Sequence, residues 1–520
     1  MLHNTMIQPM PEVRHQGQDD VYAMWPERDR AILATRANAD KTMALGAAYL
    51  PAHLVACETE NAIDAVATDR DTIDATDSAG HTALMLAAST QEAERLLQLG
   101  AAIDVQDHLG QTALMLAATA NDVERTQLLL SHHANVHLRD AEGSTVLLRC
   151  AEASAEIVAL LLAHGADPDA IDRDGDNTLM RAVTSQNVPV IKSLLPVTNV
   201  THANPKNGNT LLHVAAWTGH SRRSRLLGSI AAVCNVNACN HAGETPLLYA
   251  LRTAKDEQDL FETINTLLGA GASVHTPCHA GASPFLIACQ RGFAAVLYVL
   301  AQARANVNHK DHTGRTGLHH AVVRGHTQSI DVLVILFDVD VNCATPTGDT
   351  PLLLASAGGN KHMVRTFLTK RRMDLAHANL NGESALHVAC AGGHAAVVHE
   401  LLAYASHSLH GRDKRGRTPF LTACARGHVS VLKTLLHTGA IDVHHCDHSG
   451  QSGLLLASAN GHFDVVQWFL EIPTVLATVC NHMGYEAFHA AVVAGHGPVA
   501  ALLFQLPLVA IEAAARALDG

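Results

Sequence analysis

The protein has 520 residues, of which 48% are hydrophobic, so the chain has enough apolar surface for a folded core and disorder throughout is excluded. Aromatic residues make up only 4%, which predicts a core of small aliphatic side chains. Asp and Glu number 49 against 36 for Lys and Arg, and the net charge of −13 argues against a nucleic-acid-binding protein. The 11 cysteines include no Cys-x-x-Cys pair, which favours a reducing compartment.

The first two segments of the chain precede its repeating part. Residues 1–40 have polar clusters and no period, which predicts a flexible leader, and they lack the basic start and apolar run of a secretory signal. Residues 41–79 carry a worn copy of the pattern described next, with a helix opening at Pro51 and Ala48 in place of a glycine. We expect them to form an N-terminal cap, because an end repeat has no neighbour to cover its apolar face.

From residue 77 to residue 507 the chain repeats one short pattern. It consists of a glycine, which we call the anchor glycine, then usually Thr or Ser two residues later, Leu or Phe four residues later and Ala seven residues later. The glycine suits a turn with positive φ, the hydroxyl can cap the helix that follows, and a proline such as Pro246 fits the first helical turn. The pattern occurs 13 times, at Gly80, Gly110, Gly143, Gly175, Gly208, Gly243, Gly281, Gly314, Gly348, Gly382, Gly416, Gly450 and Gly484.

Each copy continues with a turn, often Gly-His, and a second apolar-periodic segment such as 429–436. The segments 208–215, 243–250 and 382–389, for example Gly-Asn-Thr-Leu-Leu-His-Val-Ala, resemble the ankyrin repeat. The resemblance covers 77–507 and implies an all-α repeat solenoid of stacked helix-turn-helix units, with β-turn fingers along one edge. Residues 508–520 are then expected to form a C-terminal capping helix.

The chain has 36 histidines, and most of those that can be assigned to a place in the repeat recur at the same few positions. We expect two groups of histidines to be structural. One group lies at the fifth position after the anchor glycine, and the other closes the turn between the two helices. The first group is His213, His319, His387 and His489, and the second is His220, His326, His394, His428, His462 and His496.

A further set of positions lies at the finger, two residues before the anchor glycine, where no copy of the repeat has an acidic residue. These side chains form either a solvated polar edge or a ladder that faces an acidic partner. Since the ordinary pKa of histidine is near 6.5, partner binding is predicted to weaken or invert on mild acidification, although buried histidines will resist protonation. The residues are His108, His241, His279, His312, His448 and His482, with Arg173, Lys206 and Lys414 in the same register.

Charge is distributed unevenly along the chain. Residues 1–200 carry 13 basic and 28 acidic side chains, whereas 361–417 carry nine basic and four acidic ones. The excess in 361–417 is either random variation of solvated faces or a contact surface for an acidic partner. Its basic residues are Lys361, Arg365, Lys370, Arg371, Arg372, Arg412, Lys414, Arg415 and Arg417.

Three smaller features have both a structural and a functional interpretation. Residues 252–260 contain extra residues, which either lengthen the connection between two helices or their ends, or form a charged specificity loop. The pairs Cys446/His448 and Cys480/His482 supply zinc-ligand types, but adjacent repeats are too far apart for zinc bonds of about 2.0–2.3 Å, so we predict no metal site. The resemblance also implies asparagine hydroxylation sites at Asn237, Asn308 and Asn342, of which only Asn308 follows a leucine by eight residues.

The leading functional hypothesis is a non-enzymatic scaffold or adaptor that binds partner proteins through the concave surface of fingers and first helices. An enzyme is the lesser alternative, because no phosphate-binding loop, G-x-S-x-G or H-E-x-x-H motif occurs. A membrane-linked protein is the third hypothesis. Residues 487–511 lack Asp, Glu, Lys and Arg, as a membrane span would, but they contain the turn between the two helices of a repeat, which argues against a span. We predict protein partners, no nucleic acid, no cofactor, a monomer, and a cytoplasmic or nuclear location.

Overall fold

The computed structural model describes residues 73–217, 224–337, 339–370, 372–404, 409–439, 441–472, 481–484 and 486–505. The predicted leader, the predicted closing helix and most of the predicted N-terminal cap lie outside these residues. Across the described residues the chain forms helices and no β-strand, which confirms the all-α repeat fold. The chain divides into two compact units, Met1–Thr198 and Asn199–Gly520, a division that the continuous repeat pattern does not predict.

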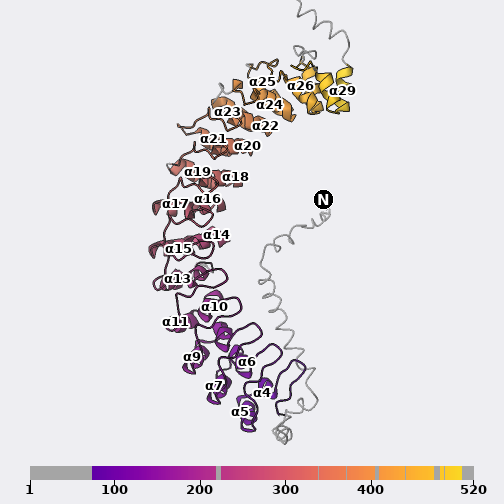
Figure 1. The fold of residues 1–520 in the computed structure, drawn as a ribbon. Helices are drawn as coiled ribbons and strands as arrows, with labels where there is room; N and C mark the ends of the chain where they lie inside the picture. The colour runs from indigo at the N-terminus through magenta and orange to yellow at the C-terminus, as the bar shows by residue number, and fades with distance from the viewer. Residues whose placement is uncertain are drawn as a thin grey trace, which may run out of the picture. The chain divides into compact units, whose positions relative to one another are not determined.

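In the described part of the N-terminal unit, a first helix opens each repeat and a second helix packs against it (Figure 1). The first helix of the third repeat is short and continues as a 3₁₀ turn, η3. The elements are α4 (Ala83–Leu86), α5 (Thr90–Gln98), α6 (Ala113–Thr119), α7 (Val123–Ser131), α8 (Val146–Arg149), η3 (Cys150–Glu152), α9 (Ala155–Ala163), α10 (Thr178–Ser185) and α11 (Val188–Leu194).

The described part of the C-terminal unit continues the same alternation, with even-numbered first helices and odd-numbered second helices. Its helices are α12 (Leu211–Trp217), α13 (Ser224–Ala231), α14 (Pro246–Thr253), α15 (Glu257–Gly269), α16 (Pro284–Arg291), α17 (Ala294–Gln302), α18 (Gly317–Arg324), α19 (Thr327–Leu336), α20 (Pro351–Ala357), α21 (Lys361–Leu368), α22 (Ala385–Ala391), α23 (Ala395–Tyr404), α24 (Pro419–Arg426), α25 (Val429–Leu436), α26 (Gly453–Ala459), α27 (Phe463–Leu470), α28 (Ala487–Val493) and α29 (Gly497–Phe504).

The repeat anchored at Gly416 shows how the sequence pattern forms each unit. Gly416 has a φ of 77°, a left-handed turn that favours glycine. The Thr418 hydroxyl then accepts a hydrogen bond from the backbone N–H of Leu421 at 3.3 Å, and Pro419 occupies the first turn of α24. The helix ends at Gly427, also left-handed, so the chain can reverse into α25.

The fingers are stabilised from within and by their neighbours. In the finger before Gly416, the Asp413 carboxylate accepts hydrogen bonds from the backbone N–H groups of Arg415 at 2.9 Å and Arg417 at 2.8 Å. The backbone N–H of Lys414 donates to the carbonyl of Asn381 in the preceding finger at 2.9 Å. Consecutive fingers are therefore joined by main-chain hydrogen bonds, as the predicted β-turn edge requires.

The small residue seven positions after the anchor glycine lets neighbouring first helices approach closely. In the C-terminal unit α20, α22 and α24 pack side by side, and the second helices α21, α23 and α25 form a parallel row (Figure 1). This position is buried in all 13 repeats, as Ala87, Ala117, Cys150, Ala182, Ala215, Ala250, Ala288, Ala321, Ala355, Ala389, Ala423, Ala457 and Ala491.

Two repeats place a glycine where others open the helix with proline, and both follow a repeat with a bulky phenylalanine. A Cβ atom on Gly317 would lie 2.5 Å from Cys289 Sγ and 3.8 Å from the ring of Phe285. A Cβ on Gly453 would lie 2.9 Å from Cys424 Sγ and 3.4 Å from Phe420. The missing side chain therefore provides the space that the cysteine sulfur of the preceding repeat occupies, with the phenylalanine ring beside it.

The extra residues near 252–260 lengthen a helix end rather than form a projecting loop. Helix α15 has 13 residues and begins directly after Asp256, whose side chain caps it by accepting from the N–H of Gln258 at 3.0 Å. Glu257 Oε1 accepts from the N–H of Ala295 at 2.6 Å, at the start of α17. The lengthened end therefore supports the next repeat, which confirms the first of the two interpretations. The alternative, a projecting charged loop, is wrong, because only residues 254–256 separate α14 from α15.

Candidate interaction surface

The predicted finger ladder is exposed, but its histidines also have a packing role that the sequence analysis missed. The rings of His241, His279, His312, His448 and His482 lie against the anchor glycine of the preceding repeat. A Cβ on Gly243, for example, would lie 2.4 Å from Cδ2 of His279. One edge of each ring thus fills the space beside a glycine while the residue as a whole stays exposed.

The basic segment 361–417 is distributed over two kinds of element. Lys361 and Arg365 are exposed on the second helix α21, and the Lys361 ammonium pairs with Glu400 Oε1 at 3.0 Å. Arg412, Lys414 and Arg415 lie in the next finger, exposed, and Arg372 is exposed in the connection between these elements. Arg371 lies outside the described residues. The sequence run therefore does not correspond to one row of equivalent repeat positions.

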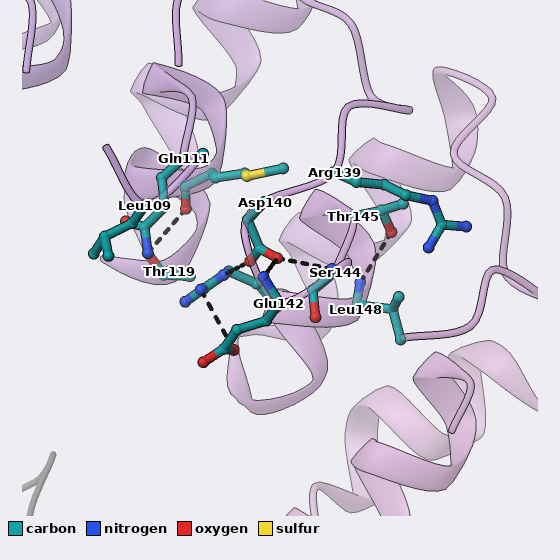
Figure 2. Close-up of polar contacts among 12 residues, drawn as sticks. Leu109, Gln111, Thr119, Arg139, Asp140, Glu142, Ser144, Thr145 and Leu148 are labelled. Atoms are coloured by element: carbon teal, nitrogen blue, oxygen red, sulfur yellow. Dashed lines mark hydrogen bonds and ion pairs between the residues drawn. The ribbon is translucent and has the colours of Figure 1, made fainter. Parts of the chain in front are cut away.

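Charge pairs join the base of the finger to the first helix, and the sequence analysis did not anticipate them. Asp140 accepts from the N–H groups of Glu142 and Ser144 and pairs with Arg149 on α8 (Figure 2). Arg181 and Asp172 repeat the arrangement at 2.6 Å in the next repeat. The sequence does contain a pattern that indicates these pairs: an acidic residue three positions before the anchor glycine and a cationic residue six positions after it.

In the C-terminal unit a histidine takes the place of that arginine. His320 Nε2 lies 2.8 Å from Asp311 Oδ2. Burial opposes ionisation of Asp311, yet hydrogen bonds from Thr313, His320 and backbone N–H groups outweigh it and hold the pKa of this carboxyl at about 2. The residue six positions after the anchor glycine therefore faces the base of its own finger, which places fingers and first helices on one surface.

Histidines five residues after the anchor glycine are structural, as predicted. His319 Nδ1 accepts from the Thr316 backbone N–H at 3.2 Å, and its Nε2 donates to the carbonyl of Asp349 in the next repeat at 3.2 Å. His213 and His387 make the equivalent contacts. Burial lowers the pKa of all three, in His319 to about 4. This confirms that the buried histidines resist protonation.

Histidines of the Gly-His turns connect repeats in the opposite direction. His428 Nε2 donates to the carbonyl of Ala391 in the preceding repeat at 3.0 Å, and its ring lies where a Cβ on Gly393 would be. His326, His394, His462 and His496 repeat this contact at 2.9–3.2 Å, which confirms their structural role. The same role stays a prediction for His489, and for His220, which lies outside the described residues.

The asparagines predicted as modification sites also connect consecutive repeats. Asn308 Oδ1 accepts from the N–H of Asp340 at 2.9 Å, and Asn342 Oδ1 accepts from the N–H of Asp374 at 2.9 Å. Asn237 makes the same contact to Ser273 at 2.7 Å. A depression of about 780 Å³ adjoins Asn308 and Asn342, between the ends of α19 and α21. Hydroxylation of these side chains stays a prediction.

Two expected absences, of a metal site and of a membrane-spanning helix, concern the described part of the chain. There, no group of three or more His, Cys, Asp or Glu side chains comes together as metal ligands would. Of the two candidate cysteines, Cys480 is outside the described residues, and Cys446 is partly buried, which raises the pKa of its thiol above the ordinary value. Among the same residues, no helix combines the length and apolar character that crossing a bilayer demands.

Helix pairs stacked in register, with hydrogen-bonded fingers along one edge, define the class of helical repeat proteins. The particular family follows from comparison with known sequences. The profile of the family "Ankyrin repeats (3 copies)" matches most of the chain, and the protein belongs to the ankyrin-repeat family. The matched stretches are 52–140, 91–172, 157–235, 251–343, 327–410, 372–445 and 402–476.

Curated relatives share parts of the array. The putative ankyrin repeat protein YahD of Escherichia coli (strain K12) is 25% identical over 113 residues, which is 22% of this chain and 54% of YahD. The neurogenic locus notch homolog protein 1 of Homo sapiens is 27% identical over 137 residues, which is 26% of this chain and 5% of that protein. The chain thus matches about half of one relative and a small part of the other. Ankyrin-repeat domains generally mediate protein–protein interaction and are typically not catalytic.

Proposed function

We propose that this protein is a non-enzymatic scaffold or adaptor that binds partner proteins through the surface formed by its fingers and first helices. The observation that carries the proposal is the contrast between two positions of the repeat. The residue seven positions after the anchor glycine is small and buried in all 13 repeats, whereas the residue two positions before it is exposed in all 13 and is His, Lys, Arg, Pro, Leu, Ala or Ser. A uniform interior with a varied edge suits recognition along an extended surface.

The proposal includes finger and basic-segment residues as partner contacts, with the second-helix pair Lys361 and Arg365 as the more peripheral ones. It also includes a monomeric state and a reducing compartment, either cytoplasm or nucleus. The nine cysteines within the described residues are all free thiols, which supports the compartment. Catalysis remains the alternative, and a purified protein that turns over a small substrate would favour it.

Site-specific photo-crosslinking tests which surface carries the function. A benzophenone side chain would replace Leu380 on a finger or Val323 on a first helix, which are 60% and 56% exposed. Matched controls on second helices are Tyr298 and Ile335, 49% and 63% exposed. We expect covalent adducts with the same few proteins from the first pair only. Adducts only from the second pair would move the interface to the second helices, and adducts from neither pair would contradict the proposed function.

A further inference from the structure

We propose that the repeats anchored at Gly348 and Gly382 form an apolar docking strip with basic flanks, and that it binds a linear protein segment with an apolar centre and acidic ends. This inference rests on the proposed function and specifies the chemistry of the partner. Two observations carry it: the apolar side chains that these two repeats place both on the finger edge and on the first helix that faces it, and the cations of the repeats on either side.

The apolar centre begins next to a repeat that has a polar pair at the same positions. In the repeat anchored at Gly314, Asp311 at the finger base pairs with His320 on α18. At the equivalent first-helix positions the next two repeats have Leu354 and Val388, both partly exposed, opposite Thr345 and Asn379. The contact between Asp311 and His320 shows that a side chain six residues after the anchor glycine faces the finger. Leu354 and Val388 therefore contribute to the surface between fingers and first helices.

The finger edge of the same two repeats is also apolar. Pro346 and Leu380 occupy the position two residues before the anchor glycine, and both are exposed, Leu380 to 60%. At the far end of the first helices the exposed or partly exposed residues are small, namely Ala357 and Ala391, each followed by glycine. A partner main chain can therefore approach α20 and α22 closely.

Cations flank the strip on both sides. The repeat before it exposes Arg315 on its finger and Arg324 at the end of α18. The repeat after it exposes Lys414 and Arg415 on its finger and Arg426 at the end of α24. Five cations thus surround four apolar side chains, and this pattern favours a ligand with acidic residues at both ends.

Two carboxylates within the strip are already bound to neutral donors. Asp349 accepts from the Thr347 hydroxyl at 2.7 Å and from the Asn379 amide at 3.2 Å. Glu383 accepts from the Asn379 amide at 3.1 Å and from the Asn381 amide at 3.4 Å. Both carboxylates are partly buried at the finger base, so they lower the positive potential of the strip without reversing it.

The geometry also sets the length of the ligand. The flanking repeats are three repeat steps apart, which corresponds to about 30 Å at about 10 Å per packed helix. An extended chain advances about 3.3 Å per residue, so about nine residues connect the two basic flanks. A strand-like segment with two or three central aliphatic side chains and acidic residues at its ends fits both the chemistry and the span.

Fluorescence anisotropy with the full-length protein and three synthetic peptides of about twelve residues tests the inference. The first peptide has a Leu/Val/Ser centre and Asp/Glu ends, the second has the same centre with Lys ends, and the third has an all-Ser centre with Asp/Glu ends. We expect the first to bind at least tenfold more tightly than either of the others, with an affinity that falls as salt increases.

Variants locate the binding. Leu380→Asp and the double variant R324E/R415E should each weaken the first peptide at least tenfold. Leu109→Asp, on a finger of the other unit and also 60% exposed, and Lys192→Glu on the second helix α11 are the matched controls and should leave binding unchanged. Equal affinity for all three peptides, no binding of the first peptide, or equal effects of L380D and L109D would overturn the inference. In each of these cases, adducts from positions 380 and 323 in the crosslinking experiment would show that the proposed function itself still holds.

Discussion

The two units of this protein use the same repeat with different connections between helices and between repeats. In the N-terminal unit the turn between helices contains Asn121 or Gln186 in the left-handed conformation, followed by Asp122 or Asn187, whose side chain caps the second helix. In the C-terminal unit the turn is often glycine followed by a histidine that donates to a carbonyl of the preceding repeat, as His428 does. Asn121 and Asn187 also bond to neighbouring repeats, at the Ser154 N–H and the Ala153 carbonyl, so both turns join repeats, but only the N-terminal one also caps the second helix with a side chain.

A second difference lies five residues after the anchor glycine. The N-terminal unit has Met85, Met115, Leu148 and Met180 there, whereas the C-terminal unit has three buried histidines that cap their own helix and donate to the next repeat. Contacts between repeats in the C-terminal unit therefore include neutral imidazoles, whereas the same positions of the N-terminal unit carry side chains that do not titrate. One fold can therefore acquire or lose sensitivity to pH through its connecting residues alone.

Mild acid should have the largest effect, and it should separate the two units. The pKa of His319 is about 4 in the folded state and near 6.5 in the unfolded state, so the unfolded chain binds the proton first as the pH falls. The stabilisation is fully present above pH 6.5 and is lost between pH 6.5 and 4, by about 3 kcal/mol for this residue. Hydrogen exchange at pH 7 and pH 5, corrected for intrinsic rates, should show greater loss of protection in the C-terminal unit.

Replacement of the responsible side chain provides the control for that experiment. Leu353 and Leu421 occupy the same position as His319 in other repeats, where they are buried and carry no titratable group. His319→Leu should therefore reduce the pH dependence of the C-terminal unit and leave that of the N-terminal unit unchanged. Equal loss of protection in both units of the original protein at pH 5 would contradict the comparison.

The next effect comes from the space beside Cys289. Gly317→Ala places a Cβ 2.5 Å from Cys289 Sγ, so overpacking should reduce the free energy of unfolding by about 1–3 kcal/mol. The double variant C289A/G317A should recover most of this loss, because alanine occupies both equivalent positions where the first two repeats meet, as Ala88 and Ala113. Urea unfolding of the original protein, the two single variants and the double variant measures the coupling, and additive effects would show that the contact does not limit packing.

The period, the helix openings and the structural roles of the buried and turn histidines were predictable because each depends on residues at fixed places in a repeated pattern. Thr418, for example, caps helix α24, as its position two residues after the anchor glycine predicts. Contacts between repeats were harder to predict, because residues such as His279 and Gly243 are far apart in sequence and only stacking brings them together. The arrangement of the basic segment was hard to predict for the same reason: residues close in sequence, such as Lys361 and Arg372, belong to different elements of the repeat.

The smallest effect tests the turn itself by exchanging its residues between units. Gln186 has a φ of 67° and is exposed, and a left-handed non-glycine residue costs about 1 kcal/mol, so Gln186→Gly should raise stability by about 0.5–1 kcal/mol. The reverse change, Gly427→Gln, should destabilise by more than that amount, because its Cβ would lie 2.6 Å from His462 Nδ1 as well as in the left-handed region. Thermal unfolding monitored in each unit by hydrogen exchange distinguishes the two contributions. If both exchanges change stability by equal and opposite amounts, backbone conformation alone determines the turn, and the histidine contact contributes nothing to the difference between the units.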